Sequence, residues 1–223
     1  CCNPGRKDRQ GRQPNEHILP ADTVRNKPAN EQAAQSNTSL DILIEKFEDS
    51  DRGTWQNPDL VLAKPGDLQG KIVADLGSGT GYFTFRIARK ASKVIALDIE
   101  QRFLEYIEDR KLDLPPAIAN KIETRLTPED TPNLQPGEAD VVFMVNVYYY
   151  LDERVEYMKK VKTALKPDGL LVLVDFKEGE MAVGPIEDKV PLARVISDLR
   201  KSGFTIVDAD NESLQYQYII SAK

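Results

Sequence analysis

The spacing of apolar residues divides the chain into a polar N-terminal segment and a patterned remainder. Residues 3–38 are rich in Asn, Gln, Pro and charged side chains and contain few large apolar residues. Such a composition cannot bury enough apolar surface to fold alone. From Ser39 onward, apolar residues recur at regular spacing. We therefore predict a disordered polar tail at 1–38 and one folded domain at 39–223.

Short apolar runs alternate with helical periodicity through most of this domain. The runs typical of buried strands are 71–76, 93–98, 122–126, 140–145 and 170–175. Helical spacing marks 39–49, 59–63, 80–90, 101–110, 153–165 and a segment that ends near Gly203. The stretches 51–58 and 166–169 are expected to be a polar loop and a turn. Strands that alternate with helices predict an α/β fold with a mainly parallel sheet and helices on both faces.

The C-terminal pattern differs from the rest, because two strand-like segments, 204–209 and 214–221, follow each other without a helix between them. An Asp/Asn-rich turn joins them, which predicts an antiparallel addition to the sheet. The alternation within 214–219 is that of an ordinary edge strand. We expect this segment to have a structural role only.

Composition and charge limit the classes of function. The chain has 223 residues, of which 40% are hydrophobic and 30% charged, an ordinary balance for a soluble domain. It contains no run of about 18 apolar residues, the length of a membrane-spanning helix. The net charge is −6, and the slightly basic tail leaves the domain more acidic still. Bulk charge therefore argues against a nucleic-acid partner.

The two cysteines, Cys1 and Cys2, stand together at the start of the sequence. The domain therefore has neither a disulfide framework nor a cysteine zinc site. The start resembles a mature bacterial lipoprotein, in which the first cysteine is acylated. A basic tail beside an acyl chain would favour an anionic membrane surface. Two alternatives stay open: a membrane-anchored lipoprotein of the bacterial envelope attached through Cys1, or a trimmed cytoplasmic protein.

A glycine-rich motif follows the first predicted strand and is the strongest chemical signal in the chain. Gly77, Gly79 and Gly81 alternate with Ser78 and Thr80. Glycine is needed where the backbone turns with positive φ or approaches a ligand closely. Ligands of open α/β sheets bind at the carboxyl ends of the strands, where the strand order reverses. We therefore expect the three glycines and Ser78 to form a ledge beneath a ligand.

Two acids help to identify that ligand. A dinucleotide pyrophosphate requires the spacing G-x-G-x-x-G, whereas this chain has G-x-G-x-G directly after Asp75. A carboxylate at this place would repel phosphate and attract an ammonium or sulfonium group. Asp98 ends the second strand, 23 positions after Asp75, where an acid can accept both ribose hydroxyls. The alternative is that the glycines only form a tight turn and Asp98 only ends a strand.

These motifs resemble those of the class I S-adenosylmethionine-dependent methyltransferases. The resemblance covers about residues 47–203 and rests on 75–81, Asp98, the fourth-strand segment 140–146 and the turn 165–171. A small bacterial subgroup is similar at two further places, with Asp-Arg-x-x-Trp-Gln-x-Pro at 51–58 and Gly-Tyr-Phe-Thr at 81–84. The resemblance implies methyl transfer from S-adenosylmethionine. It also implies a Rossmann-like, doubly wound sheet of seven strands, mostly parallel with an antiparallel last strand.

The resemblance also implies roles for residues outside the glycine motif. An acid after the third strand meets the adenine amino group, and we assign Glu129 to this place. Asn146 ends the fourth strand and is expected to touch the methionine part of the cofactor or the acceptor. Asp175 ends the fifth strand and faces the same crevice. Residues 184–186 are expected to border the acceptor pocket.

The chain departs from the subgroup at its histidines. The subgroup carries a Tyr-His-His or Tyr-His-Glu triplet after the fourth strand, where this chain has Tyr148, Tyr149 and Tyr150. The only histidine is His17, in the tail, so the domain has no imidazole base and no histidine metal site. Tyr148 and Tyr149 are our candidate catalytic residues on the acceptor side. Tyr150 is expected to pack between the sheet and a helix.

The sequence therefore supports two functions. The first is methyl transfer from S-adenosylmethionine to a small-molecule acceptor of unidentified structure, with no nucleic-acid partner. The second is a non-catalytic module that binds S-adenosylmethionine or a nucleoside and is anchored in the cell envelope. A nicotinamide dehydrogenase is disfavoured by the glycine spacing. The sequence leaves the oligomeric state open.

Overall fold

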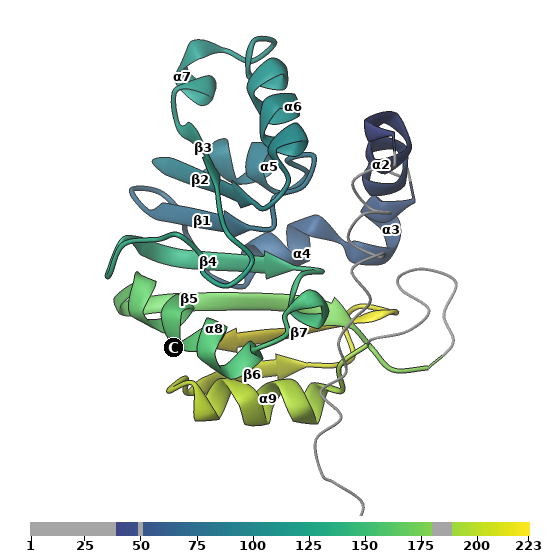
Figure 1. Ribbon diagram of the computed structural model, residues 1–223, viewed down its shortest axis with the longest axis vertical. Coiled ribbons are helices and arrows are strands. Elements are labelled where there is room, and N and C mark those ends of the chain that lie inside the picture. The colour runs from purple at the N-terminus through teal and green to yellow at the C-terminus, as the bar shows by residue number, and fades with distance from the viewer. Residues whose placement is uncertain (1–38, 49–50, 180–188) are drawn as a thin grey trace, which may run out of the picture. The chain divides into compact units, whose positions relative to one another are not determined.

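The computed structural model describes residues 39–48, 51–179 and 189–223. The polar tail at 1–38 and the segment 184–186 lie outside the described residues. Residues Ser39–Lys223 form a compact unit around a seven-stranded sheet (Figure 1). The strands are β1 (Ile72–Leu76), β2 (Lys93–Asp98), β3 (Ile122–Leu126), β4 (Ala139–Val145), β5 (Leu165–Phe176), β6 (Ile206–Asp210) and β7 (Gln217–Ala222).

The strand order is β3-β2-β1-β4-β5-β7-β6. Strands β1 to β5 pair in parallel, while β7 pairs antiparallel with both β5 and β6. The order reverses between β1 and β4, so the carboxyl ends of these two strands form the switch point at which such sheets bind ligands. The predicted fold class, a Rossmann-like sheet with an antiparallel last strand, is confirmed.

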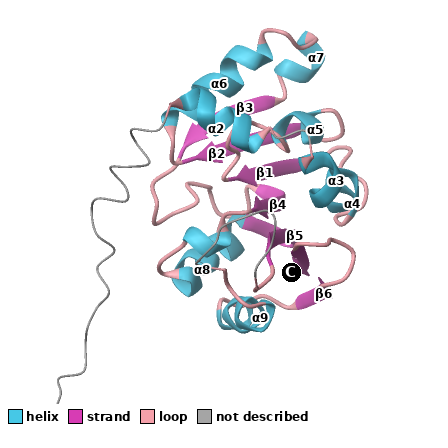
Figure 2. Ribbon diagram, turned by 90° about the vertical axis from the view of Figure 1, so that its right-hand side faces the viewer, coloured by secondary structure: helices cyan, strands magenta, loops and turns pink. Residues whose placement is uncertain are grey.

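Helices cover both faces of this sheet. They are α2 (Leu40–Phe47), α3 (Arg52–Gln56), α4 (Pro58–Ala63), α5 (Thr84–Ala88), α6 (Gln101–Lys111), α7 (Pro116–Ala119), α8 (Arg154–Ala164) and α9 (Leu192–Lys201), with a 3-10 turn η1 (Tyr148–Tyr150). Because successive strand residues point to opposite faces, Val73 joins the core beneath α4 and α5, and Ala74 joins the core beneath α8 and α9. Figure 2 shows α8 and α4 on opposite sides of the strands.

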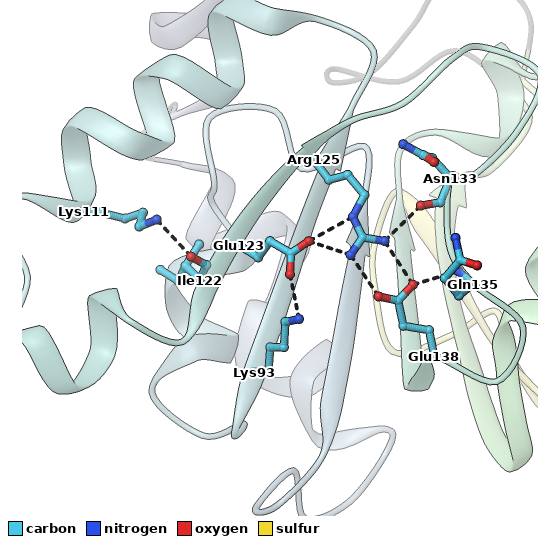
Figure 3. A network of polar contacts seen from close by, with 8 residues as sticks. All are labelled: Lys93, Lys111, Ile122, Glu123, Arg125, Asn133, Gln135 and Glu138. Atoms are coloured by element: carbon cyan, nitrogen blue, oxygen red, sulfur yellow. Dashed lines mark hydrogen bonds and ion pairs between the residues drawn. The ribbon is translucent and has the colours of Figure 1, made fainter.

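One part of the sheet is polar. In β3, Ile122 enters the core, but Glu123 and Arg125 point to the opposite face, where the described residues between β3 and β4 form no helix. Arg125 contacts Glu123 and Glu138, and Lys93 pairs with Glu123 at 2.6 Å (Figure 3). Hydrogen bonds to Arg125 lower the pKa of Glu138. Ion pairs thus cover the strands where a helix would otherwise exclude water.

Several elements differ from the sequence-based predictions. The expected loop at 51–58 contains α3 and the start of α4, and the expected turn at 166–169 lies within the continuous strand β5. The predicted helix at 80–90 is reduced to Thr84–Ala88 because the positive φ angles of Gly79 and Gly81 prevent an earlier start. Strand β7 is internal rather than at an edge, and its six residues are all buried.

Among the helices of the described residues, none is both long enough and apolar enough to cross a bilayer.

Candidate functional site

The glycine motif forms a tightly packed turn between β1 and α5. Gly77, Gly79 and Gly81 have φ angles of 76°, 51° and 85°, in the left-handed region that side chains disfavour. A Cβ at Gly77 would lie 2.2 Å from Cγ2 of Val147, and one at Gly81 would lie 2.6 Å from the ring of Phe85. Both conformation and space therefore require glycine at these two positions.

Asp75 lies beneath this ledge rather than on it. It is a residue of β1 with a relative exposure of 2%, and its Oδ2 accepts a hydrogen bond from Oγ1 of Thr84 at 2.6 Å. Burial raises the pKa of Asp75 to about 6. The dielectric constant around this buried carboxylate is lower than in water, so its attraction for a nearby cation is stronger. Thr84, its partner, was not identified from the sequence.

Asp98 lies at the carboxyl end of β2 and holds the ledge in place. Its Oδ2 accepts a hydrogen bond from the backbone N–H of Gly79 at 2.8 Å, and its Oδ1 accepts one from Glu100 at 3.0 Å. Burial raises its pKa. The structure therefore joins the second acid of the predicted cofactor site directly to the glycine motif.

Two buried hydroxyl groups on the ledge lack partners within the described residues. They are Oγ of Ser78 and Oγ1 of Thr80. Buried polar atoms in native proteins are almost always hydrogen-bonded. A polar ligand on the ledge would supply the hydrogen bonds that these two hydroxyls, beside Gly77 and Gly79, lack. The described residues thus fit a nucleoside carrying a cationic group.

Asn146 follows β4 with a φ of 61° and is held by a chain of amide side chains. Its Oδ1 accepts a hydrogen bond from Nε2 of Gln217, the first residue of β7. Oε1 of Gln217 accepts one from Nε2 of Gln56 at 3.1 Å, and Oε1 of Gln56 accepts one from Nε of Arg52 at 2.6 Å. Gln56 and Gln217 are fully buried. We call Arg52, Gln56, Gln217 and Asn146 the amide relay.

Arg52 connects this relay to the rest of the site. Its guanidinium donates to the backbone oxygen of Phe47 at 2.6 Å and lies 4.1 Å from the centre of the Tyr82 ring. Burial lowers its pKa to about 10, which leaves it charged at neutral pH. Its charge also lowers the pKa of Asp75, against the larger effect of burial. Arg52 and Gln56 belong to the 51–58 motif but were assigned no role from the sequence. Gln217 was expected to have a structural role only.

The predicted catalytic tyrosines occupy different environments. Tyr148 is fully buried, and its hydroxyl donates to Oδ2 of Asp198 in α9 at 3.3 Å. Burial raises the pKa of Tyr148, so its phenol stays neutral and cannot serve as a base at ordinary pH. The structure thus places Tyr148 in the core rather than on the acceptor side. Tyr149 is 8% exposed, and Tyr150, expected to pack inside, is 53% exposed.

The remaining candidates lie at the same edge of the sheet. Glu129 is exposed in the loop after β3, and the loop begins at Thr127, whose N–H donates to the backbone oxygen of Asp98 at 2.9 Å. Asp175, near the end of β5, is buried and accepts hydrogen bonds from the N–H groups of Tyr149 and Phe176. Burial raises the pKa of Asp175 to about 7. Asp175 is therefore an internal acid at the end of the strand.

Known proteins resemble this chain in sequence and in fold. Residues 74–171 match a methyltransferase domain model. A tRNA U34 carboxymethyltransferase of Desulfotalea psychrophila is 31% identical over 154 residues, which cover 64% of this chain and 48% of that protein. A magnesium-protoporphyrin O-methyltransferase of Rhodobacter capsulatus is 37% identical over 87 residues, which cover 39% of this chain and 37% of that protein.

A solved structure extends the likeness in fold to most of the chain. A SAM-dependent methyltransferase from Aquifex aeolicus superposes with a TM-score of 0.75 at 23% identity, covering 83% of this chain and 98% of that one. The chain spans about half the length of the tRNA-modifying relatives it matches. The domain match covers the segment that carries Asp75, the glycine ledge, Asp98 and Asn146.

The same relatives correct one prediction. We expected no nucleic-acid partner, on the ground of the net negative charge. Several relatives are named for action on tRNA, which contradicts that exclusion. Net charge was a poor guide because it averages over the whole chain, whereas an acceptor meets only the surface around one site.

Proposed function

We propose that this chain transfers a methyl group from S-adenosylmethionine to an acceptor. The premise is that it carries a methyltransferase domain on a class I fold. The observation that carries this proposal is the ledge: two backbone positions closed to any side chain, two unsatisfied hydroxyls and two buried acids converge at the switch point of the sheet. The acids favour a cationic nucleoside over a pyrophosphate.

Each group of the ledge then has a defined task. Asp98 would hold the ribose hydroxyls, and the glycine backbone with Ser78 and Thr80 would lie against the cofactor. Asp75 would stabilise positive charge from beneath, while Asn146 would orient the end of the cofactor nearest the acceptor. When bound, S-adenosylmethionine supplies an electrophilic methyl group on a sulfonium. The protein's part in such an in-line displacement is mainly to position the reactants and exclude water.

The absence of histidine from residues 39–223 favours a second candidate function, binding without turnover. An acceptor that is already nucleophilic needs no base, whereas a hydroxyl of high pKa does. A binding module would retain the ledge but would form no S-adenosylhomocysteine with any acceptor. Formation of S-adenosylhomocysteine in the presence of acceptors separates the two candidates.

The names of the relatives bear on the acceptor. One group is named for a uridine of tRNA and another protein for a magnesium-protoporphyrin. A nucleobase and a porphyrin share a planar conjugated ring. We therefore propose that the acceptor of this chain also carries such a ring, either within an RNA or as a free molecule.

Calorimetric titration with S-adenosylmethionine tests the cofactor assignment. We expect saturable binding to the full chain and at least about tenfold weaker binding to Asp98→Ala, a loss of about 1.4 kcal/mol. Asp98→Asn keeps the side-chain shape and should fall between the two. Asp168→Ala removes an exposed acid from β5 and serves as the matched control. Failure of the wild-type chain to bind millimolar ligand would refute the assignment.

A further inference from the structure

Four aromatic rings form a continuous row at the edge of the sheet. Tyr150 and Tyr149 have ring centroids 4.0 Å apart, Tyr149 and Phe176 are 6.4 Å apart edge to face, and Phe176 and Trp55 are 6.0 Å apart. We call these four residues the aromatic row. They come from three separate segments: Trp55 from α3, Tyr149 and Tyr150 from η1, and Phe176 from the end of β5.

The burial of the row is uneven. The two inner rings, Tyr149 and Phe176, are 8% and 4% exposed. The outer ring of Tyr150 is 53% exposed, and Trp55 is partly exposed. A tyrosine ring this accessible and fixed against a second ring presents a rigid face to solvent. The rings of Tyr149 and Tyr150 are tilted by 36° to each other, and a tyrosine side chain has few torsions to fix when a ligand binds.

The row lies on the side of the site that an acceptor would approach. The glycine ledge occupies the carboxyl ends of β1 and β2, and η1 and Phe176 occupy the carboxyl ends of β4 and β5. Since these strands are parallel neighbours, their carboxyl ends meet at one edge of the sheet. The row thus begins one strand away from the ledge. Asn146 lies in the short segment that connects β4 to η1.

The backbone beneath the row is well fixed. Nε and Nη2 of Arg154 donate to the carbonyl oxygens of Tyr148 and Tyr149 at 3.3 and 3.1 Å. The N–H of Tyr149 donates to Oδ2 of Asp175 at 3.2 Å. These bonds fix the backbone of η1, on which the exposed ring of Tyr150 is carried.

We infer that the aromatic row is the surface on which the acceptor's planar ring stacks, with Tyr150 as its main contact. This inference rests on the proposed function, and it names the residues that would recognise the acceptor. Stacking on an aromatic side chain accepts any flat conjugated ring, because every such ring has a π-face. The row therefore selects for planarity rather than for one pattern of hydrogen bonds.

Trp55 is the only tryptophan of the chain, so its fluorescence reports on the row without labelling. The full chain is titrated with a single-stranded RNA oligonucleotide containing one uridine, and separately with protoporphyrin. The same oligonucleotide with 5,6-dihydrouridine, whose ring is not planar, is the ligand control. Trp55→Phe keeps an aromatic ring and should abolish the signal.

The variants at Tyr150 decide the inference. We expect Tyr150→Ala to weaken ring binding by about fivefold or more, the lower range for the loss of one base–aromatic stack. Tyr150→Phe keeps the ring and should bind within twofold of wild type. Leu112→Ala removes another exposed apolar side chain, remote from the row, and should have no effect.

The outcomes separate the two sources of a planar ring. Quenching by the uridine oligonucleotide alone supports an RNA acceptor, and quenching by protoporphyrin alone supports a free one. Equal binding of a planar ring to Tyr150→Ala and wild type, or no binding of either ring, overturns the inference. If the uridine oligonucleotide binds, equal binding of the dihydrouridine oligonucleotide overturns it as well. Calorimetry with S-adenosylmethionine on the same variants shows whether such a failure concerns the row alone or the cofactor site as well.

Discussion

Tyr148 and Asp198 meet inside the core although 50 positions separate them. Asp198 is 1% exposed and also pairs with Arg194 at 2.8 Å, so its charge is compensated without the tyrosine. The phenol is surrounded by apolar side chains on the face of α8 and α9. Tyr148 therefore has a structural role: it packs in the core and makes one buried hydrogen bond.

Tyr148→Phe tests this view. The substitution removes only the hydroxyl, and we expect it to reduce the free energy of unfolding by about 0.5–1.5 kcal/mol, the usual net value of one hydrogen bond. Binding of S-adenosylmethionine and methyl transfer should change by less than twofold. Urea unfolding and calorimetry measure the two effects. A tenfold loss of methyl transfer at unchanged cofactor affinity would instead make Tyr148 a catalytic residue.

The pKa of Asp75, raised to about 6 in the folded domain by burial, gives the second residue-level prediction. In the unfolded chain this carboxyl titrates near 3.9. Between these values the folded state binds more protons, so the contribution of Asp75 to stability is greatest below pH 4. It declines as the pH rises to about 6 and is constant above. Cofactor affinity should change in the opposite sense, because a cationic ligand requires the carboxylate.

Asp75→Asn separates these two effects. At pH 7 we expect the variant to be more stable than wild type by about 2 kcal/mol, an advantage that shrinks toward pH 4. It should also bind S-adenosylmethionine at least tenfold more weakly. Urea unfolding and calorimetry between pH 5 and pH 8 measure both. If the stability difference does not depend on pH, the carboxyl does not titrate in this range.

At the scale of elements, the amide relay joins segments that are far apart in sequence. α3 and β7 meet through Gln56 and Gln217, which are 161 positions apart, and β7 in turn reaches Asn146 beyond β4. Both glutamines are fully buried, so each depends on the other for hydrogen bonds. A chain of buried amides that is fully paired specifies one arrangement of its elements, whereas a broken one is costly.

Gln217→Leu breaks the relay in its middle. We expect a loss of about 2–3 kcal/mol of stability, because Nε2 of the buried Gln56 and Oδ1 of the partly buried Asn146 both lose their partner. Since Asn146 then loses its orientation, the affinity for S-adenosylmethionine should fall by about tenfold. Thermal unfolding and calorimetry check both. Gln69→Leu, an exposed glutamine, is the control. Destabilisation without loss of affinity would restrict the relay to a structural role.

Hydrophobic spacing predicted some of the elements and missed others. Continuous apolar runs predicted β1, β2, β4 and the second half of β5 because those segments are buried on both faces. The spacing missed α3, whose residues 52–56 are mostly polar, and it divided β5 at its exposed residues Pro167 and Asp168. It could not place β7 between β5 and β6, because pairing order depends on contacts between distant segments rather than on local period.

At the scale of the whole molecule, the residues that we assign to the cofactor could be found from the sequence, whereas those that we assign to the acceptor could not. Asp75, the glycines and Asp98 lie within one βαβ unit, where a short motif fixes their relative positions. The aromatic row and the amide relay are assembled from α3, η1, β5 and β7. No local spacing relates Trp55 to Phe176 or Gln56 to Gln217. Charge was equally uninformative at this scale, since ions of opposite sign neutralise each other in networks such as that around Arg125.

The position of β7 has a consequence for the nascent chain on the ribosome. Strands β1 to β5 and the glycine ledge are synthesised first, but β7 must still enter between β5 and β6. Until it does, the edge of β5 is unpaired, and such an edge readily pairs with other chains. The same late step brings Gln217 to Asn146. The pairing of β7 therefore covers the aggregation-prone edge of β5 and completes the amide relay in the same step. A translational pause before residue 217 would leave the edge of β5 unpaired and the relay incomplete.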